Sequence, residues 1–298
     1  MLSLSGHDVA VGVAISDGLR DILEIDPYLI DYVEVPFERL LHSPEILTDL
    51  ALPVVLHCAS LSVAGNLPPD PLLVAKLQQW IARSRTPWVG EHLAFVSMAG
   101  QSTGPAEHPE FAPPVDVWAT EGERYNVSYT VSPQFSAEIL ERVSTALDRW
   151  EARLACPLVL ENGPVYFTVP GSTMSQCEFI SALCRARPAT RLLLDLAHLT
   201  CTATNTREDP ERLLESLPLE NVIEVHLSGA TSEAGLMWDD HAAPISPLSF
   251  ALLDRVLRRV RPRAITIEYN WDPDFPIDTL CEDLRRVRRA IAAPALAA

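Results

Sequence analysis

The segment that decides the fold is RLLLDLAHLTCTATN, residues Arg191 to Asn205. Its apolar run from Leu192 to Leu194 indicates a buried parallel strand that ends at Asp195 and His198, where we expect the strand to give way to a loop. A carboxylate and an imidazole at the end of a buried strand are costly unless another group compensates them. A divalent metal ion would do so, and so would a salt bridge between two core residues. This segment alone leaves both interpretations open.

The same pattern of a short apolar strand, a polar residue and an amphipathic helix recurs along the chain. We expect strands at residues 9–14, 30–35, 53–56, 88–89, 158–160, 192–194, 222–225 and 264–267. We expect helices at residues 17–25, 70–84, 133–154, 175–185, 209–216, 247–260 and 277–291, with Asp17 capping the first. Eight strands alternating with helices predict an α/β fold, a (β/α)8 TIM barrel, with residues 1–298 forming a single domain.

Two segments interrupt this pattern. Ser97 to Thr120 is rich in Gly, Pro, Ser and Ala, which predicts a long loop over one face of the barrel. Met237 to Asp240 carries a tryptophan. Both follow strands on the side where the expected ligands emerge, so we expect both to contact a bound substrate.

Composition narrows the classes of protein. The formal net charge of -17 disfavours a nucleic-acid partner, because an acidic surface repels phosphates. We find no signal peptide and no apolar run of membrane-spanning length, and therefore expect a soluble, cytoplasmic protein without a membrane partner. Six cysteines without a CxxC pair are interpreted as reduced, mostly buried thiols. No GxGxxG turn follows a strand, which weakens a dinucleotide-binding interpretation.

Residues of the types that bind metals gather at the expected strand ends. The candidate ligands are His57, His92, Glu161, Asp195, His198, His226 and Glu268, together with Asp239 and His241 in the loop WDDH. Each alone could be a hydrogen-bonded wall residue or the partner of an arginine. Together, however, the carboxylates would repel one another in one barrel mouth, and two or three metal ions remove that conflict. Mixed oxygen and imidazole ligands suit Fe, Mn or Zn. The remaining histidines, His7, His42 and His108, are expected at the surface.

The order of these residues resembles that of the xylose-isomerase-like TIM barrels, particularly the trinuclear AP endonucleases. The amino-acid sequence around these residues is more similar to that of the multinuclear non-haem iron oxidative enzymes, a family formerly described as a domain of unknown function. That resemblance rests on LHCASLSVAG (56–65), GEHLAF (90–95), LENGP (160–164), LLLDLAHL (192–199), VHLSGA (225–230) and IEYNWD (267–272). Many members read Asp-x-Asn-Asn where this chain has Asp195 followed by His198. The substitution replaces an amide with a better ligand, so a third metal would be held more firmly here.

The resemblance implies an enzyme that uses two or three irons, as Fe2+ or Fe3+, and O2 to modify cysteines of a ribosomally made precursor peptide. Members of the family make methanobactin oxazolones or excise a cysteine β-carbon in thiaglutamate biosynthesis. The nine candidate ligands would then hold the irons, with Glu161, Asp195 and His198 as catalytic residues and Glu161 bridging two metals. The resemblance also implies a small partner protein that binds the leader peptide, giving a heterodimer.

Three other interpretations remain. A metal-dependent phosphodiesterase of the AP-endonuclease kind would use the same metals but needs a basic approach surface. A sugar isomerase would need a metal pair and a proton-moving Lys or His, and lysines are scarce here. A non-catalytic binding protein would use the barrel only as a scaffold, and metal content separates it from the enzymes.

Overall fold

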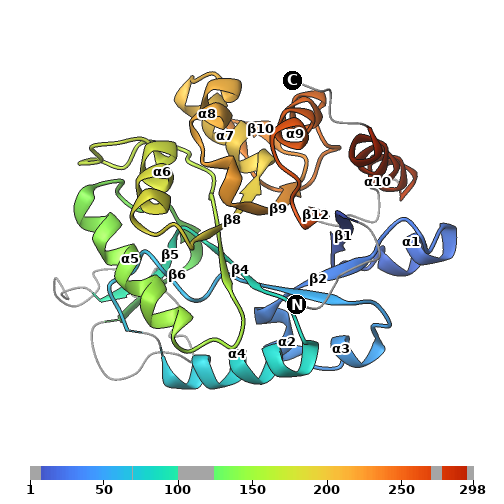
Figure 1. The fold of residues 1–298 in the computed structure, drawn as a ribbon, viewed down its shortest axis with the longest axis horizontal. Helices are drawn as coiled ribbons and strands as arrows, with labels where there is room; N and C mark the ends of the chain where they lie inside the picture. Colours follow the sequence, from blue (N-terminus) through green and yellow to red (C-terminus); the bar gives the residue numbers. More distant parts are fainter. Residues whose placement is uncertain (1–7, 69, 100–123, 270–276, 294–298) are drawn as a thin grey trace.

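The computed structural model describes residues 8–68, 70–99, 124–269 and 277–293. Eight parallel strands close into a barrel in the order β1-β12-β9-β8-β7-β4-β3-β2, which confirms the predicted TIM barrel (Figure 1). The barrel strands are β1 (Ala10–Ala14), β2 (Tyr32–Pro36), β3 (Val54–Cys58), β4 (Val89–His92), β7 (Leu158–Glu161), β8 (Arg191–Asp195), β9 (Val222–Leu227) and β12 (Ala264–Ile267).

Helices surround the barrel and cover the outer face of its strands (Figure 1). They are α1 (Leu19–Ile25), α2 (Phe37–His42), α3 (Ile46–Asp49), α4 (Pro71–Ser84), α5 (Ala137–Glu151), α6 (Gln176–Ala186), α7 (Leu196–Thr206), α8 (Pro210–Ser216), the 3-10 turn η2 (Leu219–Asn221), α9 (Pro247–Arg259) and α10 (Ile277–Ala292). None of them, within the described part of the chain, is long and apolar enough to cross a membrane.

Side-chain caps fix the starts of the longer helices. Asp70 accepts a hydrogen bond from the backbone N–H of Leu72 ahead of α4, and Ser136 and Ser246 cap α5 and α9 in the same way. Ser175 forms a reciprocal capping box at α6. Such caps satisfy amide groups that the first helical turn leaves without partners, and each contributes on the order of 1 kcal/mol.

Two hairpins follow carboxyl ends of barrel strands and were not predicted. The first pairs β5 (Phe95–Ala99) with β6 (Arg124–Val131) after β4, and the second pairs β10 (Thr231–Glu233) with β11 (Leu236–Trp238) after β9. The expected loop Ser97–Thr120 therefore begins inside β5, and its residues 100–120 lie outside the described residues. The second hairpin carries Trp238 immediately before Asp239.

The predicted boundaries were wrong at three helix starts. His198 lies in no loop, because α7 begins at Leu196, directly after the strand, and Asp195 caps it by accepting from the His198 backbone N–H. Asp17 does not cap α1, whose N-cap is Gly18 without a side-chain bond. The expected helix at 133–154 is shorter, since Ser136 is its cap.

The barrel interior has a mainly apolar lower layer, where Trp88 donates to the buried Glu224 carboxylate, and a polar upper layer. The lower layer contains Tyr32, Val55, Trp88, Val159 and Leu193, all at most 2 % exposed. Because side chains of a strand alternate between its two faces, the neighbouring positions pack outward against the helices. The strand ends above this layer carry the polar residues.

Candidate metal centre

Nine of nine predicted ligands lie among the described residues, and the carboxyl ends of the barrel strands bring them together. Their atoms form four groups of three, each with donor atoms within 4.8 Å of one another. The groups are His57 with His92 and Glu161, His198 with Asp239 and His241, Asp195 with His226 and Glu268, and Glu161 with Asp195 and His198. The first three groups share no residue, so the nine side chains could hold up to three ions, and the fourth group takes one residue from each of them.

Glu161 lies at the centre of this arrangement. Its Oε2 atom is 2.7 Å from His57 Nε2 and 3.3 Å from His92 Nε2. Its Oε1 atom is 3.2 Å from His198 Nδ1 and 3.9 Å from His226 Nδ1. The carboxylate is 1 % exposed, and its two oxygens face different sets of histidines. A carboxylate placed in this way can bridge two ions.

The second group joins α7 to the loop after β11. Asp239 Oδ2 is 2.7 Å from His198 Nε2 and 3.2 Å from His241 Nε2. His241 adopts φ of 54°, the left-handed region that is uncommon for residues other than glycine. Strained backbone of this kind often occurs at functional sites. His241 Nε2 also lies 3.9 Å from Glu268 Oε2, which connects this group to the third.

Asn162 determines which nitrogen of His198 faces the second group. The Asn162 carbonyl oxygen lies 2.7 Å from His198 Nδ1, and a carbonyl can only accept, so Nδ1 carries a proton. In the metal-free protein Nε2 donates to the Asp239 carboxylate at 2.7 Å, and it is the nitrogen that would lose its proton to bind an ion. The Asn162 side chain is itself fixed to the Asp195 backbone, accepting from its N–H at 2.9 Å and donating to its carbonyl at 3.0 Å. Hydrogen bonds that orient ligands in this way are typical of metal sites.

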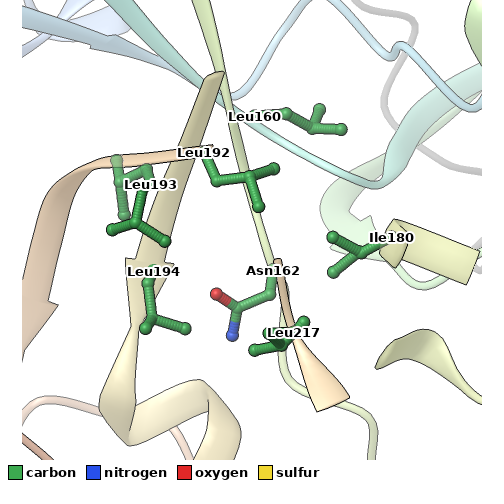
Figure 2. Close-up of a pocket in the computed structure, with 8 residues that line it drawn as sticks. Leu160, Asn162, Ile180, Leu192, Leu193, Leu194 and Leu217 are labelled. Atoms are coloured by element: carbon green, nitrogen blue, oxygen red, sulfur yellow. The ribbon is translucent and has the colours of Figure 1, made fainter. Parts of the chain in front are cut away.

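Figure 2 shows Asn162 beside a small pocket lined by leucines of β7, β8 and neighbouring segments. This cavity of about 10 Å³ is lined mainly by apolar side chains, such as Leu192 and Leu194. It holds at most one water molecule. The apolar residues around the pocket therefore surround Asn162, and the pocket is too small to be a substrate site.

Several buried polar atoms of the candidate ligands lack a hydrogen-bond partner in the described part of the chain. They include Asp195 Oδ2, His226 Nδ1, His92 Nδ1 and Asp239 Oδ1. Buried polar atoms without a partner are rare in native proteins and costly. Asp195 and His226 belong to the same group, and a metal ion bound between them would satisfy both atoms. The donor set therefore fits a transition metal with mixed oxygen and nitrogen ligands.

The electrostatics of the centre reflect this crowding. Burial would lower the pKa of His57, but the adjacent Glu161 carboxylate outweighs it and raises that pKa to about 10. Burial lowers the pKa of His92 to about 4. Burial alone would raise the pKa of Glu161, yet the surrounding histidines hold it well below its ordinary value. Burial raises the pKa of Asp195 to about 6, and the nearby Asp239 and Glu161 carboxylates act in the same direction.

Gly90 makes room for His57. A Cβ atom at Gly90 would lie 2.6 Å from His57 Cδ2, closer than real Cβ contacts allow. The two residues are neighbours in register on β4 and β3. Glycine at this position therefore allows the imidazole to reach Glu161.

Sequence reasoning missed two buried carboxylates, Glu34 in β2 and Glu224 in β9. They are 2 % and 0 % exposed and face His226 Nε2, at 3.0 Å and 3.7 Å. The search considered strand ends, and these residues lie inside strands. The available signal was a glutamate within the apolar segments YVEVP and VIEVHL, where a charge is costly without a partner.

The surface histidine prediction is confirmed for His42, which is exposed, whereas His7 and His108 lie outside the described residues. All six cysteines are free, as expected, and all but Cys156 are buried. Burial raises the pKa of the Cys58 thiol, with Glu38 acting in the same direction, so a structural role fits this residue better than a reactive one.

A closed (β/α)8 barrel with five imidazoles and four carboxylates at its mouth defines a TIM barrel with a candidate multinuclear metal centre. The chain belongs to the family described as RiPP precursor modification enzyme MbnB/TglH/ChrH, whose model matches residues 11–105 and 118–292. RiPP denotes a ribosomally synthesised and post-translationally modified peptide. The family resemblance expected from the sequence is thereby confirmed.

Similar proteins include two UPF0276 proteins of Caulobacter vibrioides. One is 30% identical over 227 residues, covering 75% of this chain and 72% of the relative. The other is 27% identical over 281 residues, covering 92% of this chain and 91% of the relative. Among solved structures, D-psicose 3-epimerase from Clostridium cellulolyticum H10 aligns with a TM-score of 0.56 at 10% identity, over 95% of this chain and 98% of that one. At that identity, the structural likeness shows the fold alone.

Proposed function

We propose that this chain is a multinuclear non-haem iron enzyme that uses O2 to modify cysteine residues of a ribosomally made precursor peptide. The observation that carries the proposal is the gathering of nine donor side chains in four overlapping groups of three, two of which contain Glu161. The family supplies the class of substrate, a precursor peptide. The nine residues predicted from the sequence are the proposed ligands.

The proposed ligand set suits iron. Each group offers a mixture of imidazole and carboxylate donors, and three protein ligands leave coordination positions open. Bound iron would supply the capacity to bind a substrate thiolate and to activate O2. The chain's own residues would hold the ions: Glu161 is the proposed bridge, Asp195 and His198 are proposed ligands that share one group with it, and Asn162 fixes the orientation of His198.

Aromatic residues next to the ligands are placed to contact the peptide. The rings of Tyr166 and Trp238 lie 5.0 Å apart, and the Tyr166 hydroxyl accepts from the backbone N–H of Asp239 at 3.4 Å. Phe167 beside them is 67% exposed. Exposed aromatic rings bury apolar substrate surface at little entropic cost. A peptide on this rim would have its side chains near the second ligand group.

A separate small protein is the proposed holder of the leader peptide, forming a heterodimer with this barrel in the cytoplasm. A flexible peptide loses conformational freedom on binding, and docking its leader raises the effective concentration of the reactive cysteine. The isolated enzyme is therefore expected to modify its peptide slowly.

The hydrolase and isomerase interpretations gain no support from particular residues. The net charge of -17 disfavours a phosphodiester polymer as substrate. Lys76 is the single lysine of the chain and lies on α4, outside the barrel, so it is not placed to move protons at a sugar. The likeness to epimerases concerns the fold.

Metal analysis and peptide mass spectrometry test the proposal. We expect two to three irons per chain after anaerobic reconstitution, and an O2-dependent mass change in a cysteine-containing precursor peptide supplied with the partner protein. His198→Ala should lower both iron content and turnover, whereas His42→Ala, which removes an exposed histidine of α2, should change neither. Less than about one transition metal per chain, or full activity of His198→Ala, would contradict the proposed site.

A further inference from the structure

Both ring nitrogens of His226 face carboxylates, but on opposite sides. The ring is fully buried in β9, with Nε2 3.0 Å from Glu34 Oε2 and Nδ1 3.2 Å from Glu268 Oε2. Nδ1 has no hydrogen bond in the described part of the chain, and it faces the group formed with Asp195 and Glu268. One nitrogen is therefore hydrogen-bonded and the other is directed at the third ligand group.

Glu224 is held by other donors, which leaves the hydrogen bond with His226 to Glu34. The Trp88 indole N–H donates to Glu224 Oε2 at 2.5 Å, and the Thr266 hydroxyl donates to Glu224 Oε1 at 3.1 Å. Since the Thr266 proton is used, the Tyr32 hydroxyl donates to Thr266 at 2.6 Å. Glu224 lies 3.7 Å from His226 Nε2 and adds negative charge behind the ring without a close hydrogen bond.

His198 and His226, the two most deeply buried histidines of the site, are therefore oriented by different acceptors. His198 donates from Nδ1 to the neutral carbonyl of Asn162 at 2.7 Å, and the Glu161 carboxylate is farther from this nitrogen, at 3.2 Å. His226 has a carboxylate, Glu34, as its acceptor, and a carboxylate behind a metal-bound imidazole raises the basicity of the ligand nitrogen. A more basic ligand with negative charge behind it favours the more oxidised state of the metal.

We infer that Glu34 is a positioning residue that holds His226 with its proton on Nε2, presents Nδ1 to an ion shared with Asp195 and Glu268, and makes this position the one that best stabilises the more oxidised ion. The inference rests on the proposed metal centre for its redox part. The orientation of His226 is independent of which metal binds and of the reaction catalysed.

Crystals of the full chain soaked anaerobically with Co2+ locate the ion by its anomalous signal. We expect a peak on the Nδ1 side of His226, between Asp195 and Glu268. A peak on the Nε2 side, between Glu34 and Glu224, would overturn the inference, because these three residues also form a group that could hold an ion. Co2+ needs no oxidative activity, so this result stands or fails separately from the proposed function.

Three variants measure the role of Glu34 in solution. Glu34→Ala should weaken Co2+ binding at one position by roughly 10- to 100-fold, the usual cost of losing a group that orients a ligand. Glu34→Gln keeps an oxygen acceptor for Nε2–H and should retain the ion, but the reduction potential of one iron should rise because the charge is lost. Glu91→Gln is the matched control, since Glu91 is 1 % exposed and accepts from the Leu61 backbone N–H instead of a ligand ring.

Equal Co2+ affinity in Glu34→Ala and Glu91→Gln would overturn the positioning role. An unchanged iron potential in Glu34→Gln would overturn the redox part. Should Glu34→Ala fail to fold, the Glu34→Gln potential and the crystal position still decide the inference. If the wild-type protein does not oxidise the peptide but the Co2+ results are as expected, the proposed function is refuted and the inferred orientation of His226 still holds.

Discussion

The lower and upper layers of the barrel interior are built from the same strands but are stabilised in different ways. In β8, Leu193 belongs to the apolar lower layer, and Asp195, two residues further along the same face, belongs to the ligand cluster. In β7, Val159 and Glu161 have the same relation. Shape complementarity stabilises the lower layer, whereas the upper layer concentrates charges that need ions. Stability and chemistry are therefore separated by two residues along β7 and β8, whereas β9 places the carboxylate of Glu224 beside Trp88 of the lower layer.

Glu161→Ala is the substitution expected to have the largest effect on the upper layer. The change removes the carboxylate that His57, His92 and His198 share, so we expect metal content to fall by at least one ion per chain and turnover by more than about 100-fold. Elemental analysis and peptide mass spectrometry measure the two effects. Retention of all metals with high activity would exclude Glu161 as a bridge.

Leu193→Ala is the corresponding change in the lower layer. Deleting a side chain that is 1 % exposed leaves a cavity and should lower the free energy of unfolding by about 2–5 kcal/mol. Metal stoichiometry should stay that of the wild type, because the leucine offers no ligand atom. Denaturant unfolding with parallel metal analysis checks both outcomes, and a lost ion would show that the layers are not separate.

Gly90→Ala tests whether the space beside Gly90 is needed to position the His57 ring. The added methyl group would displace the His57 ring, so we expect a loss of turnover of roughly 10- to 100-fold. Gly163→Ala is the control, because a Cβ there has no atom within 4 Å, and its effect on stability should stay within about 0.5 kcal/mol. Steady-state kinetics of the two variants decide between a steric role for Gly90 and a general sensitivity of glycines.

The smallest expected effect is the release of protons from histidine ligands when metal binds. In the metal-free protein the pKa of His57 is about 10 and that of His241 about 9, so both imidazoles are protonated at pH 7. A metal ligand must be deprotonated, so binding releases these protons and metal affinity rises with pH up to about pH 9–10. Isothermal titration calorimetry in buffers of different ionisation enthalpy measures the release. An affinity independent of pH between 6 and 8 would contradict it.

The barrel was predictable because its strands are apolar runs with a period that differs clearly from that of the helices. Strand ends such as His57 and Glu161 also follow from sequence, since parallel strands place their carboxyl ends on one face. The start of α7 could not be predicted, because Asp195 looks like a strand terminus and serves as a helix cap as well. Glu34 was missed because its partner, His226, is 192 residues distant along the chain.

The helix α7 is fixed at both ends. At its start, Asp195 and His198 belong to the ligand cluster, and near its end the Asn205 side chain exchanges two hydrogen bonds with the Met237 backbone of β11. An α-helix rises about 1.5 Å and turns about 100° per residue. One inserted residue would rotate Asn205 away from the hairpin that carries Asp239. The length of α7 thus sets the spacing between His198 and the segment that carries Asp239, so an insertion within this helix is expected to separate two ligands of the same group.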